Sequence, residues 1–256
     1  MFTHAIVRPP ASNFAEGLTT AGLGLPDYPR ALEQHEAYCA ALEQCGLTLT
    51  RLDPDPDYPD STFVEDVAIL TERCAILTRP GAPSRRGEVE SLRNVLPQFF
   101  PSLHEIESPG TVDGGDICQA GEHFFIGVSA RTNEAGGRQL SEILAQAGYA
   151  SSLVGITRSA SLLHLKSGIA WLSDNRLVIT RALADRPELG PFDLVRVVDD
   201  EGYAANCVRV NDCVLIAAGH PKLGADLDQL GYETVALEMS EFQKMDGGLS
   251  CLSLRF

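Results

Sequence analysis

The chain lacks a hydrophobic run long enough to cross a membrane, since no stretch of about 18 apolar residues occurs in its 256 residues. At its start, residues 1–4 lead directly into Ala5, Ile6 and Val7, without the basic-then-apolar pattern of a leader peptide. No linker or low-complexity segment divides the chain. We therefore expect a cytoplasmic protein of one domain, residues 1–256, with no membrane partner.

The chain also lacks the cysteine patterns that form disulfide frameworks or zinc sites. Its seven cysteines are odd in number, and no two are spaced as C-x-x-C. Neither a disulfide framework nor a thiol-ligated zinc site is indicated, and we expect reduced thiols.

Positive charge is scarce, because 20 Lys and Arg stand against 35 Asp and Glu and give a formal net charge of -15. Binding to nucleic acid requires Lys and Arg that neutralise phosphates, so we expect no nucleic-acid partner. A cationic small molecule would suit this charge. The alternative is that the acidity only keeps the protein soluble.

Four pairs of short apolar segments separated by turn residues predict four β-hairpins. A fifth pair is formed by the two chain ends, which would otherwise be open sheet edges. The hairpins begin about 40 to 50 residues apart, which is typical of one repeated supersecondary unit. The pairs are residues 67–70 with 74–78, 116–120 with 124–127, 169–172 with 177–180, 207–210 with 214–217, and 252–256 with 3–7.

Helical patterns lie between the hairpins, at residues 28–46, 88–96 and 133–148. The pattern L-x-Q-x-G ends at Gly46, Gly148 and Gly231. Glycine suits the left-handed residue that ends a helix, so the repeated pattern indicates three equivalent helix ends. Together with the hairpins, it predicts a ring of five β/α modules. The spacing is unequal, and an ordinary α/β sheet is the alternative.

Chemically active residues stand at the same place in each module, at or just before the first hairpin strand. Equivalent positions of a ring meet at its centre, so we expect these residues to share one small volume. Each also has a structural alternative, such as a core histidine, a turn cap or a solvated loop. The residues are Glu65, Asp66, Asp113, Asp116, His164, Lys166, Asn206 and Cys251.

Cys251 is the candidate nucleophile, because it follows the flexible residues 246–248, although most free cysteines are small core residues. A thiolate near the imidazole of His164 combines a nucleophile with a proton carrier. Carboxylates around them would hold a cation, and a planar guanidinium binds carboxylates in a bidentate way. The guanidinium carbon is then a suitable electrophile, whereas crowded acids would oppose the oxyanion of a peptidase.

Strings along the whole chain resemble the dimethylarginine dimethylaminohydrolases, a family of the guanidine-modifying pentein superfamily. This resemblance implies a five-bladed pseudo-symmetric α/β propeller closed by pairing of the N- and C-terminal strands. It also implies hydrolysis of Nω-methylated L-arginine to L-citrulline and methylamine or dimethylamine, with neither a metal nor an organic cofactor. The strings are PDSTFVED (59–66), the segment 80–88, TVDGGD (111–116), SARTN (129–133), LHLKS (163–167), AANC (204–207) and DGGLSC (246–251).

The resemblance also implies roles for the residues that carry the reaction. Cys251 would form a covalent thiouronium intermediate with the substrate. His164 would protonate the departing amine and then activate water. Asp113 would orient and charge His164. Asp66, with Glu65 beside it, would bind the guanidinium.

At the amino-acid end of the substrate, the resemblance implies contacts of both charges. Arg85 and Arg131 would clamp the α-carboxylate. Asp60 and the backbone of Leu18 and Met245 would hold the α-amine. Residues 17–24 would form a lid that excludes water.

Three other functions remain open at this stage. Arginine or agmatine deimination uses the same chemistry, amidino transfer delivers the intermediate to an amine, and a guanidinium-binding protein would have no turnover. The chain length and the strings FVED and LHLKS favour the methylarginine hydrolase. The expected partner is a small cationic amino acid, and the sequence leaves open whether the chain forms a homodimer.

Overall fold

The computed structural model describes residues 1–157, 162–173 and 175–256. They form two compact units, of which the first consists of Met1–Val64 with Val197–Phe256 and the second of Glu65–Arg196. No helix in the described ranges is long and apolar enough to span a membrane.

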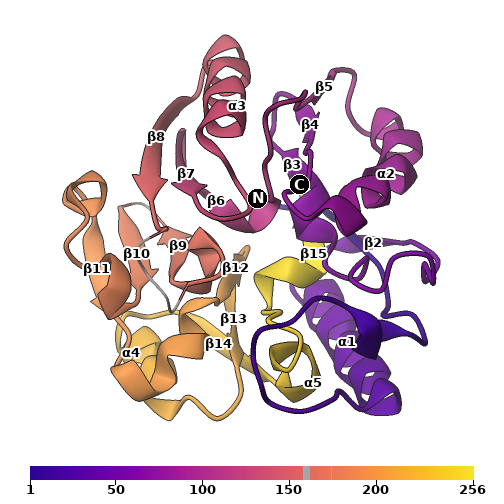
Figure 1. The fold of residues 1–256 in the computed structure, drawn as a ribbon. Coiled ribbons are helices and arrows are strands. Elements are labelled where there is room, and N and C mark those ends of the chain that lie inside the picture. Colours follow the sequence, from indigo (N-terminus) through magenta and orange to yellow (C-terminus); the bar gives the residue numbers. More distant parts are fainter. Residues whose placement is uncertain (158–161, 174) are drawn as a thin grey trace. The chain divides into compact units, whose positions relative to one another are not determined.

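Within the described residues, fifteen strands form five three-stranded sheets of the same topology (Figure 1). In each sheet the first two strands pair antiparallel, and the third joins the middle strand in parallel. The sheets of the second unit are β3 (Ala68–Leu70), β4 (Ala75–Leu77) and β5 (Leu103–Glu105); β6 (Ile117–Ala120), β7 (His123–Val128) and β8 (Ala150–Gly155); and β9 (Ile169–Ser173), β10 (Arg176–Ile179) and β11 (Asp193–Arg196).

The first unit holds the sheet that joins the chain ends. Its strand β15 pairs antiparallel with β1, with Leu254 opposite Ile6, which confirms the predicted pairing of the terminal strands. The four internal hairpins are confirmed as well. The sheets of this unit are β15 (Ser253–Arg255), β1 (His4–Val7) and β2 (Thr48–Arg51), and β12 (Val208–Val210), β13 (Cys213–Ala217) and β14 (Glu233–Leu237).

The helices predicted at residues 28–46, 88–96 and 133–148 are confirmed, each two or three residues shorter than expected. Gly46 and Gly148 follow two of them, and Gly231 follows another helix; their φ angles are 93°, 84° and 84°, as the L-x-Q-x-G pattern requires. Between β10 and β11 the described residues form only short 3-10 helices, which accounts for the unequal module spacing. The helices are α1 (Tyr28–Gln44), α2 (Val89–Val95), α3 (Glu134–Gln146), α4 (Pro221–Gln229) and α5 (Ser240–Gln243).

A short 3-10 helix precedes the first strand of every sheet, and these turns carry or adjoin the candidate site residues. The sequence predicts their positions but not their conformation, because one turn of 3-10 helix has no hydrophobic period. The turns are η2 (Val64–Val67), η5 (Gly114–Asp116), η6 (Leu165–Ser167), η9 (Asp199–Ala205) and η10 (Ser250–Leu252).

The cores hold these turns in place. In the second unit, Leu165 belongs to a buried cluster with Phe125 and Ile179, and so anchors the turn η6. In the first unit, the hydroxyl of the buried Tyr38 on α1 lies 2.6 Å from Ser253 Oγ on β15. Each large apolar side chain buried in this way contributes about 1.5–3 kcal/mol.

Candidate active site

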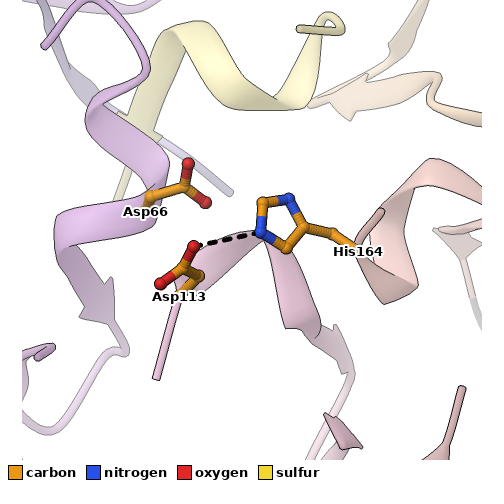
Figure 2. A group of neighbouring side chains, drawn as sticks. All are labelled: Asp66, Asp113 and His164. Atoms are coloured by element: carbon orange, nitrogen blue, oxygen red, sulfur yellow. Dashed lines mark hydrogen bonds and ion pairs between the residues drawn. The ribbon is translucent and has the colours of Figure 1, made fainter. Parts of the chain in front are cut away.

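His164 and Asp113 form a buried hydrogen-bonded pair in the second unit. His164 immediately precedes η6 and Asp113 immediately precedes η5, so two turns present the two side chains. His164 Nε2 lies 3.1 Å from Asp113 Oδ2 (Figure 2). Asp113 is fully buried, and its other carboxylate oxygen accepts from the backbone N–H of Gly81 at 2.8 Å. The hydrogen bond between Asp113 and His164 fixes the imidazole ring in one orientation.

Asp66 is the third member of this group, and Figure 2 shows its carboxylate directed at the same imidazole. Arg85 Nη1 donates to Asp66 Oδ2 at 2.5 Å, and the backbone N–H of Gly115 donates to Oδ1 at 2.9 Å. Arg85 also binds Glu88 with two parallel hydrogen bonds of 2.9 and 2.8 Å. A buried guanidinium therefore lies between two buried carboxylates.

The acids around His164 change its protonation. Burial disfavours the imidazolium, but Asp66, the hydrogen bond to Asp113 and the charge of Asp116 outweigh burial and raise the pKa of His164 to about 9. Burial would raise the pKa of Asp66, but Arg85 and His164 outweigh it and lower this pKa to about 2. Near neutral pH the group therefore holds a charged imidazolium beside a charged carboxylate.

Asp66, Asp113 and His164 each offer one ligand atom, and these atoms lie within 4.8 Å of one another. Their charges are already matched inside the chain, however, since Arg85 binds Asp66 and Asp113 binds His164. A metal ion would have to break both interactions. The arrangement therefore favours proton transfer over metal binding.

Three further predicted residues lie in the second unit. Lys166 Nζ forms an ion pair with Glu65 Oε1, so Glu65 also has a cationic partner within the chain. Arg131 follows β7, and its backbone N–H donates to Ser129 Oγ at 2.9 Å. Arg131 Nη1 is shielded from solvent and has no hydrogen-bond partner among the described residues.

In the first unit, the half-buried Cys251 lies in η10. The side chains of Asn206 and Tyr203 form hydrogen bonds with the backbone just before it. The backbone N–H of Gly248 donates to Cys251 Sγ at 3.4 Å. Asn206 Oδ1 accepts from the N–H of Ser250 at 2.9 Å, and the Tyr203 hydroxyl donates to the Gly247 carbonyl at 2.9 Å. The turn thus directs a backbone donor at the sulfur.

The predicted α-amine contacts are neighbours in the first unit. Both carboxylate oxygens of the buried Asp60 accept from the N–H of Leu18, at 3.1 and 3.2 Å. Gly17 lies against them, because a Cβ there would be 2.5 Å from Asp60 Oδ1 and 3.2 Å from Met245 Cε. The structure thus brings Leu18, Asp60 and Met245 together, and adds Gly17.

Sequence reasoning missed several residues that support the site. Glu88 stands in the quoted segment 80–88, but only the structure shows that it binds Arg85. Gly115 was part of TVDGGD without a role, although its N–H binds Asp66. Tyr203 has no sequence signal. Cys251 and His164 lie in different units, so their predicted meeting stays a prediction.

Comparison with known proteins agrees with this chemistry. A family model described as arginine deiminase matches residues 53–200. The N(G),N(G)-dimethylarginine dimethylaminohydrolase of Pseudomonas aeruginosa is 47% identical over 257 residues, covering 100% of this chain and 100% of that protein. The chain belongs to the dimethylarginine dimethylaminohydrolase family.

Solved structures of dimethylarginine dimethylaminohydrolase extend the match to the fold. A cysteine-to-serine variant from Pseudomonas aeruginosa, complexed with citrulline, has a TM-score of 0.97 at 46% identity and covers 100% of both chains. A histidine-to-glycine variant, as an adduct with S-methyl-L-thiocitrulline, gives the same TM-score, identity and coverage. The predicted fold class, an α/β protein with the pseudo-symmetric topology of the five-bladed propeller, is confirmed by the five matching sheets and these likenesses.

Proposed function

We propose that this hydrolase converts Nω-methylated L-arginine, either asymmetric dimethylarginine or monomethylarginine, to L-citrulline and dimethylamine or methylamine. The observation that carries the proposal is His164 with its raised pKa, buried between Asp66 and Asp113. An alkylamine leaves a guanidinium only when it is protonated, and this imidazolium is a suitable acid at neutral pH. The family membership supports the same reaction.

The reaction begins with the thiolate of Cys251, which attacks the guanidinium carbon. As the bond between carbon and the methylated nitrogen breaks, its electron pair stays on that nitrogen, which takes the proton of His164. The products are the free alkylamine and a thiouronium linked to Cys251. His164, now neutral, accepts a proton from water, and the hydroxide attacks the same carbon. The carbon–sulfur bond then breaks and releases the thiolate. The hydroxyl on that carbon loses its proton to the released alkylamine, which becomes an ammonium ion, and the product is L-citrulline.

Charge selects the cationic end of the substrate. The buried carboxylates of the second unit include Glu65, Asp66, Glu88, Asp113 and Asp116, whereas their cationic partners are Arg85, Lys166 and the imidazolium of His164. Acids therefore outnumber cations in this group. A guanidinium reduces that excess, whereas an anion would increase it.

The α-carboxylate of the substrate requires a cation whose charge is not already neutralised. Arg85 donates at least three of its N–H groups to Asp66 and Glu88, so its charge is largely compensated. Arg131 offers the shielded Nη1 without a partner among the described residues. We assign Arg131 the larger part of carboxylate binding and Arg85 the smaller, with Asp60 at the α-amine.

A cytoplasmic location is part of the proposal. All seven cysteines are free thiols, as expected in a reducing compartment. Fractionation of cells that express the chain tests the location.

Substrate turnover tests the proposal. The purified chain is incubated in turn with asymmetric dimethylarginine, monomethylarginine and arginine, and citrulline and the released amine are measured. Equal amounts of citrulline and alkylamine from the methylated substrates are expected, with no release by Cys251→Ser. Citrulline and ammonia from arginine alone would establish arginine deimination instead, which the match to the arginine deiminase model makes the second candidate.

A further inference from the structure

Asp116 is a fully buried carboxylate that takes no part in the proposed reaction, yet it touches two segments of the site. Its Oδ1 accepts from the backbone N–H of Leu165 at 3.0 Å, directly after His164. Its Oδ2 accepts from the hydroxyl of Ser129 at 2.6 Å, in the turn that carries Arg131. One carboxylate thus lies between the proton carrier and the proposed carboxylate clamp.

Ser129 extends this contact to Arg131. Its Oγ accepts from the backbone N–H groups of Arg131 at 2.9 Å and Thr132 at 3.0 Å while donating to Asp116. Thr132 Oγ1 in turn accepts from the N–H of Asp113 at 3.1 Å. The direction of each hydrogen bond is fixed, because Ser129 Oγ already receives two donors and must donate to the carboxylate.

Little space surrounds Asp116. A Cβ added to Gly127 would lie 3.0 Å from Asp116 Oδ1 and 2.8 Å from Leu165 Cβ. Strand β7 therefore packs its glycine against the carboxylate, which cannot shift toward it.

The charge of Asp116 acts on His164 as well. The ionisable groups that face His164 in the second unit are Asp66, Asp113 and Asp116, and all three favour the imidazolium against the opposing effect of burial. Burial raises the pKa of Asp116 itself to about 6, because His164 and hydrogen bonds from Ser129, Thr132 and Leu165 offset only part of the burial cost. Asp116 is therefore ionised when the enzyme works above that pH.

We propose that Asp116 is a positioning residue that couples the proton carrier to the substrate clamp. It holds His164 through Leu165, it holds Arg131 through Ser129, and its negative charge keeps the imidazole protonated. The coupling to substrate rests on the proposed function. The effect on His164 does not, because it is measured in the protein without substrate.

The first measurement is an NMR titration of the His164 ring, assigned by comparison with His164→Asn. Asp116→Asn keeps an oxygen for the Leu165 N–H but turns an NH₂ group toward Ser129 Oγ, which has no remaining acceptor site. We expect the His164 midpoint to fall by about one pH unit, because one of three nearby negative charges is lost. An unchanged midpoint in the folded variant would overturn the proposal, whatever the substrate proves to be.

The second measurement separates the effect of Asp116 on His164 from its effect on Arg131. It uses steady-state kinetics with the methylarginine that the wild type turns over. Ser129→Ala keeps the carboxylate of Asp116 but removes the hydroxyl that links it to the backbone N–H groups of Arg131 and Thr132. We expect KM to rise about tenfold while the His164 midpoint stays within about 0.3 units of the wild type. The matched control is Glu134→Gln on α3, an exposed acid, which should change neither quantity.

The outcomes distinguish the proposal from a purely structural role. If Asp116→Asn and Ser129→Ala lose activity only in proportion to a lower folded fraction, with midpoint and KM unchanged, Asp116 is structural. If Asp116→Asn does not fold, Ser129→Ala decides alone, and an unchanged KM refutes the coupling. Wild-type inactivity toward every methylarginine would refute the proposed function, while the NMR result would still stand.

Discussion

Gly115 is the residue whose substitution tests the site geometry most directly. Its φ angle is not positive, so an alanine meets no backbone strain there. Its Cβ, however, would lie 2.7 Å from His164 Nδ1 and 2.9 Å from Asp66 Oδ1. Ordinary contact begins at 3.4 Å, so the imidazole must retreat by about 0.7 Å, the difference between the two distances.

The expected losses in activity and stability differ in size. Overpacking by one methyl group lowers the free energy of unfolding by about 1–3 kcal/mol. Replacing glycine by alanine raises it by about 0.4–1 kcal/mol, because alanine restricts the unfolded chain. A misplacement of about 1 Å between reacting groups can cost about 100-fold in rate. We therefore expect Gly115→Ala to remain folded at about 25 °C while kcat falls about 30- to 100-fold.

The assay pairs kcat with urea unfolding, and the control is Gly155→Ala at the end of β8. A Cβ added at Gly155 would meet no atom within 4 Å, and the φ angle there is not positive, so alanine should leave both quantities within error. A Gly115→Ala enzyme with wild-type kcat would refute the packing argument. Parallel loss of kcat and folded fraction would point to stability alone.

Three further predictions concern single groups. Cys251→Ser should abolish turnover but retain substrate binding measured by calorimetry, because a serine hydroxyl is scarcely ionised; residual turnover above about 1% would refute the nucleophile assignment. His164 has its pKa raised from 6.5 to about 9, so its contribution to stability is complete below pH 6.5 and is lost as the pH rises through 9. Urea unfolding should show that the wild type loses at most about 3 kcal/mol of unfolding free energy over this pH range. His164→Asn should lose none of this contribution, and an equally flat pH profile for the wild type would contradict the raised pKa of His164. Arg131→Ala should raise KM about 10- to 100-fold with little change in kcat, the loss of about 1.5–3 kcal/mol of charged hydrogen bonding. The exposed Arg138→Ala is its control, and equal KM values would remove Arg131 from the clamp.

Local features of the fold were predictable because their causes are local. The hairpins follow from apolar runs and turn residues, and Gly46, Gly148 and Gly231 end helices because glycine adopts positive φ at little cost. The module position of the candidate residues was also predictable, since repeats align without knowledge of contacts.

Charge partners were not predictable from the sequence. Asp113 and Asp116 are three residues apart and of the same type, yet one binds the ring of His164 and the other the N–H of Leu165. The segment around Arg85 indicated a cation for the substrate, but the tertiary fold surrounds that guanidinium with Asp66 and Glu88. Partners of a long side chain depend on distant segments, and no local pattern records them.

The repeated turns explain how acids are kept ionised inside a protein. The first N–H groups of a 3-10 helix have no partner within the helix and need an acceptor. In three cases a side chain of the preceding module supplies it: Asp66 accepts from Gly115 in η5, Asp116 from Leu165 in η6, and Asn206 from Ser250 in η10, at 2.9, 3.0 and 2.9 Å.

Each of these hydrogen bonds links one module to the next and fixes a turn that presents a reacting or binding group. Where the acceptor is a carboxylate, the backbone donor also offsets part of the cost of burying its charge, and that charge in turn favours the imidazolium of His164. The same bond that joins two modules therefore tunes the proton carrier. Substitutions of Asp66 or Asp116 should for this reason change the titration of His164, whereas the neutral Asn206 can affect only the position of the turn that carries Cys251.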